Sequence, residues 1–233
     1  MTGVVETQRW SLLPTGILWI IAPLWYLLCE AITALAFPGY DYAAFYISDL
    51  GVPGTTTFQG RELASQIPQV MDAGFIGQGL LFLLGLVLAM PALRPGLGRV
   101  GLLLVGCLHV AGIVFVALVP GSPENVANGL IVIHALGAVA AILGGNCAAL
   151  FSVAPLRDLG RVRWSGAVLG ALGIVSGLLL TVHVLLPDGV WERGAVYPFL
   201  LWELIIGAAL THSHRATGAL ALRRTDRTVE EAR

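Results

Sequence analysis

The sequence predicts an all-α membrane protein, a polytopic bundle of six transmembrane helices. Of its 233 residues, 57% are hydrophobic and only 12% are charged, whereas a soluble domain contains about 25% charged residues. Six apolar segments approach the roughly 20 residues that a helix needs to cross a hydrocarbon core of about 30 Å. This balance excludes a water-soluble enzyme and a disordered chain. The formal net charge of −1, with basic residues in small groups, also argues against nucleic-acid binding.

The apolar segments give the order of the spans. The first is too long and too rich in tryptophan to be a cleaved signal peptide, so we expect it to remain as a span. Only one connection is long, and the chain 1–233 is therefore expected to form a single membrane domain. The expected spans are 12–37, 71–93, 100–120, 129–153, 164–187 and 196–211, with an external loop at 38–70 and a cytoplasmic tail at 212–233.

Arginine distribution predicts the orientation, because short cytoplasmic segments retain positive charge. The chain has 13 basic residues, all arginine. Only Arg61 and Arg193 fall on the side of the long loop, and the other arginines fall on the opposite side. We therefore expect a multi-pass protein of a bacterial cell membrane with both termini in the cytoplasm.

Titratable side chains inside spans are costly and are functional candidates by default. Counting 1.5 Å per residue along each helix places all five near the membrane midplane or in its outer half. We therefore expect them to converge there. They are Glu30, His109, His134, His183 and Glu203.

Aromatic residues accompany the two carboxyl groups. Trp19, Pro23, Tyr26, Glu30 and Thr33 recur at spacings of three or four, which places them on one helix face. That face is expected to look into the bundle. Three further aromatic residues lie close to the acids in the sequence: Trp25 beside the first face, and Phe199 and Trp202 flanking Glu203.

Each feature also has a structural interpretation. Aromatic residues near a membrane boundary are commonly interfacial, and a single histidine in a span commonly serves structure through hydrogen bonds. Glu192 and Arg193 are adjacent and could pair with each other or with Asp49. A carboxyl group in hydrocarbon, by contrast, must be protonated or paired, which favours a function for Glu30 and Glu203.

Short motifs add a resemblance to a known family. The six-helix plan, the segment 46–51 (Tyr-Ile-Ser-Asp-Leu-Gly), the histidine of the fourth span and the segment 191–193 (Trp-Glu-Arg) resemble the bacterial integral-membrane family called domain of unknown function 998. The Ile-Ser-Asp-x-Gly segment and a glutamate in the last span are also distantly similar to the DRAM-type six-helix membrane proteins. The resemblance implies a fold and a connection with lipids, and fixes no reaction.

The leading functional prediction is an intramembrane enzyme acting on a lipid or isoprenoid from the outer leaflet. A carboxylic acid in an apolar pocket stays protonated at neutral pH, as a general acid requires, and aromatic faces stabilise cations. This chemistry suits protonation-initiated cyclisation of a prenyl chain, and small membrane terpene cyclases of actinobacterial and fungal pathways are similar in size. The predicted catalytic residues are Glu30, Glu203 and Asp49, and the predicted substrate-binding residues are Trp25, Tyr26, Phe199, Trp202, His134, His183, Glu192 and Arg193, with no cofactor.

Two other functions remain open. Metal-dependent lipid hydrolysis could use His109, His134, His183 and Asp49 as a zinc site, although no pair has the i, i+4 spacing of a helix-borne site. A transporter or a non-catalytic lipid-organising protein is the third, since an outer polar cluster can also fix the register of helices. The two halves of the chain show no inverted repeat, which argues mildly against a secondary carrier. The sequence does not specify an oligomeric state.

Overall fold

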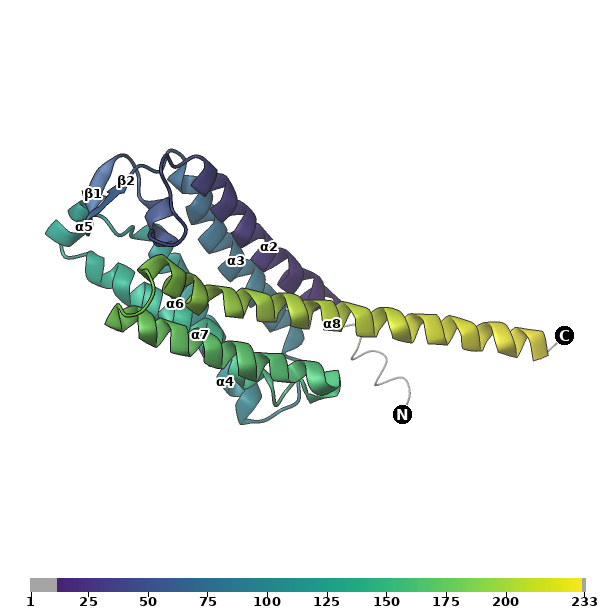
Figure 1. Cartoon of the computed structure of the whole chain (residues 1–233). Helices are drawn as coiled ribbons and strands as arrows, with labels where there is room; N and C mark the ends of the chain where they lie inside the picture. The colour runs from purple at the N-terminus through teal and green to yellow at the C-terminus, as the bar shows by residue number, and fades with distance from the viewer. Residues whose placement is uncertain (1–11, 232–233) are drawn as a thin grey trace.

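The computed structural model describes residues 12–231, with side chains described as far as Ser213. Six helices in this range are long and apolar enough to cross a membrane, which confirms the predicted fold class. They form an elongated bundle from which the end of the last helix projects (Figure 1). The helices are α2 (Leu13–Leu35), α3 (Pro68–Ala89), α4 (Leu97–Leu118), α6 (Ile131–Ser152), α7 (Ser165–Val182) and α8 (Asp188–Glu231).

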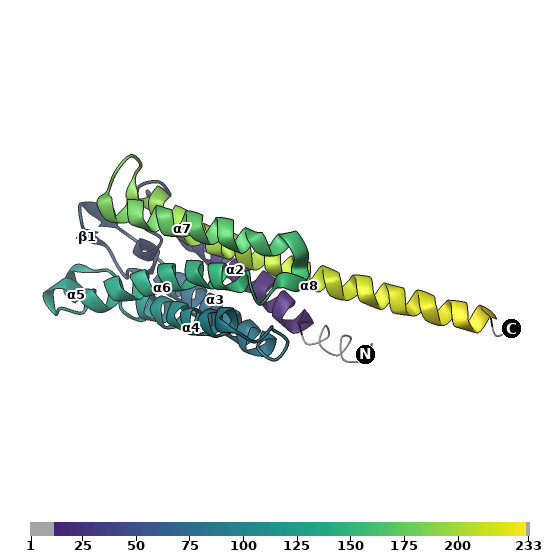
Figure 2. The same cartoon turned by 90° about the horizontal axis from the view of Figure 1, so that it is seen from below.

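The helices pack in a closed ring. Going round it, α2 contacts α3, α3 contacts α4, α4 contacts α6, α6 contacts α7, α7 contacts α8, and α8 returns to α2. A further contact joins α6 to α8 across the ring. Figure 2 shows α7 with α8 and α6 with α4 as neighbouring pairs along the bundle. This arrangement brings the last helix against the first, so residues far apart in the sequence become neighbours.

The two sides of each helix differ in the way a lipid environment requires. Large aliphatic side chains face outward on every span, among them Leu24, Leu80, Leu104, Leu136 and Leu172, each at least half exposed. In water such an apolar surface would be strongly unfavourable, whereas hydrocarbon solvates it. The interior holds the largest fully buried side chains, which include Trp19, Phe82 and Trp202.

Glycines allow the closest helix contact. A methyl group at Gly112 of α4 would collide with the backbone of Ala141 on α6, and one at Gly137 would lie 2.9 Å from the Gly112 carbonyl oxygen. Small residues permit such close approach of membrane helices. Gly166 and Gly170 of α7 likewise face the backbone of α6.

The two ends of the bundle are built differently. At one, here called the loop end, residues 36–67 contain a 3-10 helix, η1 (Ser48–Gly51), and a hairpin of β1 (Thr56–Phe58) with β2 (Arg61–Leu63), and α5 (Pro123–Ala127) lies nearby. The other, the arginine-rich end, carries the connection 90–96 and a 3-10 segment, η2 (Arg157–Trp164).

Helix boundaries differ from the expected spans by a few residues at most ends, and by the largest amounts at the two ends of the last helix. The last helix begins at Asp188, before the expected start at 196, because Trp191, Glu192 and Arg193 continue the helical run. It also extends as a helix to Glu231, through the expected tail 212–233.

Candidate functional site

The guanidinium of Arg193, in α8, connects the long loop to α2 and α8 through hydrogen bonds. Its Nη1 donates to the backbone oxygens of Tyr42 at 2.6 Å, Phe45 at 3.0 Å and Gly189 at 3.1 Å. Its Nη2 donates to the Tyr40 hydroxyl at 2.6 Å. One buried cation therefore donates to two backbone carbonyl groups of the loop and to one in the first turn of α8.

The same arginine forms a buried ion pair with Glu30 of α2. Nε and Nη2 of Arg193 lie 3.2 and 3.0 Å from Glu30 Oε1, and the Tyr197 hydroxyl lies 3.0 Å from both carboxylate oxygens. Glu30 therefore has both a cation and a phenol as hydrogen-bond partners. This pairing with Glu30, and not with Glu192 or Asp49, answers the question that the adjacent acid and base of α8 leave open.

A second acid–base pair stabilises the loop closer to its surface. Arg61 of the hairpin donates to Asp49 at 2.8 and 3.3 Å, and the Tyr46 backbone N–H donates to Asp49 at 2.9 Å. Burial raises the pKa of Asp49, against the opposing effect of Arg61. Asp49 is thus committed to holding the loop, with the Arg61 guanidinium 4.3 Å above the Tyr46 ring.

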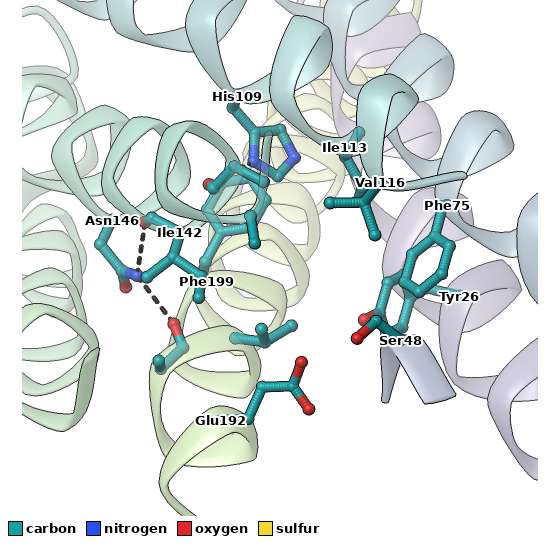
Figure 3. A pocket seen from close by; sticks show the side chains of 14 residues that line it. Tyr26, Ser48, Phe75, His109, Ile113, Val116, Ile142, Asn146, Glu192 and Phe199 are labelled. Carbon is teal, nitrogen blue, oxygen red and sulfur yellow. Dashed lines mark hydrogen bonds between the residues drawn. The ribbon is translucent and has the colours of Figure 1, made fainter. Parts of the chain in front are cut away.

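A small apolar cavity lies inside the ring of helices towards the loop end (Figure 3). Its volume is about 50 Å³, which exceeds the roughly 10–15 Å³ that one water needs and falls below the roughly 300 Å³ of a typical ligand pocket. The cavity therefore has room for a few non-hydrogen atoms and not for a whole ligand. Its walls are mostly aliphatic and aromatic, and its polar lining residues are Tyr26, Ser48, His109, Asn146 and Glu192.

Glu192 is the acid that borders this cavity. It accepts a hydrogen bond from the Ile47 backbone N–H, which holds its side chain beside η1. Figure 3 shows the Glu192 carboxyl group directed towards the interior space, opposite Tyr26 and Ser48. Arg193, the cation adjacent to it in sequence, is already bound to Glu30. Glu192 therefore combines a fixed position with an oxygen on the cavity side.

Three polar side chains form a connected unit at the inner end of the cavity. Gln78 of α3 donates from Nε2 to Glu203 Oε2 at 2.8 Å, and its Oε1 lies 3.0 Å from His109 Nε2. His109 Nδ1 lies 2.8 Å from the Ala141 carbonyl oxygen. Both ring nitrogens of His109 are therefore engaged, and the residue also lines the cavity.

The protons of this unit can be arranged in two ways. With Gln78 as described, both His109 nitrogens face oxygen acceptors, so the ring is an imidazolium balanced by a Glu203 carboxylate. Rotating the Gln78 amide by 180° exchanges its donor and acceptor, so that a neutral His109 and a protonated Glu203 satisfy the same contacts. Glu203 Oε1 is buried without a hydrogen-bond partner among the described residues, which favours the uncharged arrangement.

The predicted titratable residues do not converge as expected. Glu30 lies in the ion pair with Arg193, and Glu203 lies with His109 but does not line the cavity. His134 contacts the Val119 carbonyl oxygen at 2.7 Å, and His183 contacts Asp188 at 2.9 Å. The five side chains therefore lie in four different sets of contacts.

The predicted substrate-binding residues also divide. Tyr26, Phe199 and Glu192 line the cavity. Trp202 packs beneath it against Trp19, at 5.2 Å between ring centroids. Trp25 is 39% exposed and donates to the Ala73 carbonyl oxygen. Arg193, His134 and His183 make the contacts described above and do not line the cavity.

Polar residues that the sequence reasoning does not select complete the site. Gln78 and Asn146 are fully buried amides within spans, and Tyr40 and Tyr197 complete the network around Arg193. A search for intramembrane amides as well as charges would have found Gln78 and Asn146. In the described part of the chain, no three His, Cys, Asp or Glu side chains are grouped so that they could hold a metal ion.

Comparison with known proteins gives one family. The chain matches the family described as protein of unknown function (DUF998) over residues 20–209, a range that includes every polar residue of the cavity and of the Arg193 network. No curated protein and no solved structure matches the chain.

Proposed function

We propose that this chain, which belongs to the DUF998 family, is a membrane-embedded enzyme that isomerises a lipid or isoprenoid by general acid chemistry. The observation that supports the proposal is the Glu192 carboxyl group, held by the Ile47 N–H at the edge of an apolar cavity. We further propose a bacterial cell membrane as its location, with the arginine-rich end in the cytoplasm.

Glu192 takes the role of proton donor in this proposal. Glu30 is neutralised by Arg193, Asp49 by Arg61, and Glu203 does not line the cavity. A carboxyl group beside apolar walls, without a cation of its own, costs least as the neutral acid, which is the form that donates a proton. Its position on the cavity side distinguishes Glu192 from the other three.

The remaining cavity wall suits a cationic intermediate. Tyr26 and Phe75 are in edge contact, with ring centroids 5.7 Å apart, and Phe199 lies on the same cavity. Aromatic faces attract a positive charge through their quadrupole. An aliphatic wall and few polar atoms also keep water away from such a cation.

Protonation-initiated cyclisation of a prenyl chain is the specific reaction that we propose. The Glu192 proton adds to a terminal double bond or epoxide, a carbon–carbon bond forms as a second double bond is consumed, and the Glu192 carboxylate takes a proton from the carbon beside the resulting cation. The product is an isomer of the substrate, so the cycle needs no co-reactant. The cavity receives the reacting end, while the rest of the chain lies among the helices and lipid.

The test is conversion of defined prenyl compounds by the purified protein in lipid nanodiscs. Farnesol, geranylgeraniol and their terminal epoxides are incubated separately, and products of unchanged mass with one double bond fewer, or with the epoxide opened, are sought by gas chromatography and mass spectrometry. Glu192→Gln keeps the shape and an acceptor oxygen for Ile47 N–H. We expect it to lower the rate by about 100-fold or more, the range of a lost general acid.

Glu62→Gln is the matched control. Glu62 is an exposed carboxylate of the hairpin that accepts a hydrogen bond from Thr57, so the same substitution at the same end leaves the cavity intact. Unchanged turnover in Glu192→Gln would reject Glu192 as the acid. The absence of any isomer from all four classes of probe would reject the isoprenoid reaction and favour a lipid-organising protein, for which the fully paired Arg193 network is the favouring observation.

A further inference from the structure

A hollow surrounded by arginines lies at the arginine-rich end, remote from the cavity. It is formed where the connection before α4 meets the connection after α6, and its volume is about 360 Å³, within the range of ligand pockets. Arg94, Arg99 and Arg157 line it together with the backbone of Gly96 and Gly98. Two short connections, far apart in the sequence, thus place three guanidinium groups round one space.

The charges round this hollow are unbalanced. Arg94 donates to Asp158 at 2.7 and 3.2 Å, in a pair exposed to solvent. Arg99 makes one long contact, 3.4 Å, with the Leu93 carbonyl oxygen. Arg157 has no hydrogen-bond or ion-pair partner among residues 12–213. Three cations against one carboxylate leave an excess of positive charge facing the hollow.

The start of α4 adds to this field. Gly96 precedes the helix with φ +139° and no side chain caps it. The first amide N–H groups of a helix have no partner within the helix and carry partial positive charge, and here Gly96 and Gly98 line the same hollow as the arginines. The backbone therefore favours an anion at the same place.

An apolar groove continues from the hollow along the outside of the bundle. The two share Gly98 and Ala154. The groove, of about 320 Å³, is lined by Leu150, Phe151, Val153 and Trp164, and Phe151 and Trp164 are 42% and 54% exposed. Such a surface suits a hydrocarbon chain and not a free water-soluble anion.

Arg163 adds a further cation to the lining of the groove. It lines the groove, and its guanidinium carbon lies 5.2 Å from the centroid of the Trp164 ring. Its Nε is buried and has no partner among the described residues. A buried N–H group without an acceptor costs free energy, and an ester or phosphate oxygen at the neck of the groove would remove that cost.

We propose that the hollow and the groove together bind an anionic phospholipid of the adjacent leaflet, with the phosphate among Arg94, Arg99 and Arg157 and one acyl chain along Phe151 and Trp164. The presence of arginines at this end of the bundle would by itself be explained by the orientation of the protein in the membrane, because the positive-inside rule requires only positive charge in the cytoplasmic segments. Arginines gathered round a ligand-sized hollow that opens onto an apolar groove go beyond that requirement. Basic pockets between helices are a known means of holding lipid headgroups.

Native mass spectrometry of the full-length protein in mild detergent provides the test. Phosphatidylglycerol and phosphatidylcholine with the same acyl chains are added in parallel, and the fraction of protein that retains one lipid is measured. Phosphatidylglycerol is expected to be retained preferentially. The double variant Arg99→Gln/Arg157→Gln is expected to weaken its retention about tenfold, as two charge-assisted contacts are lost.

Arg161→Gln is the charge-matched control. Arg161 belongs to η2 but does not line the hollow, so its loss should leave retention unchanged. The single variant Arg157→Gln removes no contact among the described residues, and it keeps the test decisive if the double variant fails to fold. Substitution Trp164→Ala is expected to lower retention of phosphatidylglycerol by loss of the chain contact.

Three results would overturn the proposal. Equal retention of phosphatidylcholine would show that the anionic headgroup is not recognised. An equal loss in Arg161→Gln and Arg157→Gln would show unspecific attraction by net charge. Displacement of the lipid by millimolar sn-glycerol phosphate or inorganic phosphate, with no effect of Trp164→Ala, would identify a free phosphate as the ligand. None of these results depends on the enzymatic proposal for the cavity.

Discussion

Arg193 and Glu30 form an ion pair that closes the ring of helices at the loop end. The guanidinium approaches the Glu30 carboxylate to 3.0 Å, both side chains are buried, and they come from α8 and α2. The same guanidinium donates to three backbone oxygens of the loop and of α8. The first helix, the last helix and the long loop therefore depend on one side chain.

Replacing Arg193 should destabilise the protein more than replacing both partners. Arg193→Met leaves Glu30 buried without a counter-charge, which costs about 3–5 kcal/mol in comparable sites. Adding Glu30→Gln removes the stranded charge and should restore part of the loss. Thermal unfolding of the single and the double variant in one detergent measures the effect, with Arg161→Gln as a surface control. A loss in Arg193→Met no larger than that of the control would contradict the assigned role.

Tyr197→Phe isolates one contact of the same network. It removes the hydroxyl that donates to Glu30 at 3.0 Å and keeps the ring. Because Arg193 continues to balance the charge, the expected loss is only about 0.5–1.5 kcal/mol, the usual net value of one hydrogen bond. The same unfolding measurement should therefore rank Tyr197→Phe well below Arg193→Met, and the reverse order would show that the phenol, not the guanidinium, carries the Glu30 charge.

Glu203 should be protonated in the folded protein. The uncharged arrangement of Glu203, Gln78 and His109 avoids separating charges within the membrane. The infrared difference spectrum between wild type and Glu203→Gln should therefore show that the variant lacks the carbonyl band of a carboxylic acid. It should show no loss of a carboxylate band. Gln78→Leu should shift that band, because Gln78 is the hydrogen-bond partner of Glu203. A lost carboxylate band would assign the imidazolium form to His109.

Gly112 should tolerate no side chain. A Cβ atom there collides with backbone atoms of α6, which cannot move aside as a flexible side chain can. Gly112→Ala is expected to cost about 1–3 kcal/mol or to prevent folding, as overpacking does. At Gly177 the nearest atom is Ile142 Cγ2 at 3.3 Å, so Gly177→Ala serves as the helix-interior control. Equal stability of the two variants would refute the close contact of α4 with α6.

Much of the fold follows from local features of the sequence. Each span is an apolar run of sufficient length, so its position can be predicted from consecutive residues of the sequence. The periodic face of the first span is confirmed as well: Trp19, Pro23, Tyr26, Glu30 and Thr33 are all buried. Side-chain spacing fixes which face of a helix is polar, although it does not say what the face meets.

The partners in the site could not be predicted in that way. Glu30 and Arg193 are 163 residues apart, and their contact depends on α8 closing the ring against α2, an order that no local pattern encodes. Gln78 joins Glu203 to His109, and as an uncharged amide it has no titratable group that would mark it in the sequence. The adjacency of Glu192 and Arg193 in the sequence suggests that the two could pair with each other. In the structure Arg193 pairs with Glu30, and Glu192 faces the cavity.

The hydrogen bonds that hold the long loop against α2 and α8 limit the routes by which a molecule can reach the cavity. Entry from the aqueous side at the loop end would break the Arg193 contacts and the bond between Ile47 N–H and Glu192, whereas most side chains with which the helices line the cavity are apolar. If the cavity takes the hydrophobic substrate that we propose, that substrate should dissolve in the bilayer first, and its mole fraction in lipid, not its concentration in water, should set the occupancy of the cavity. Assays at a fixed aqueous concentration should accordingly give apparent affinities that change with the amount of lipid present.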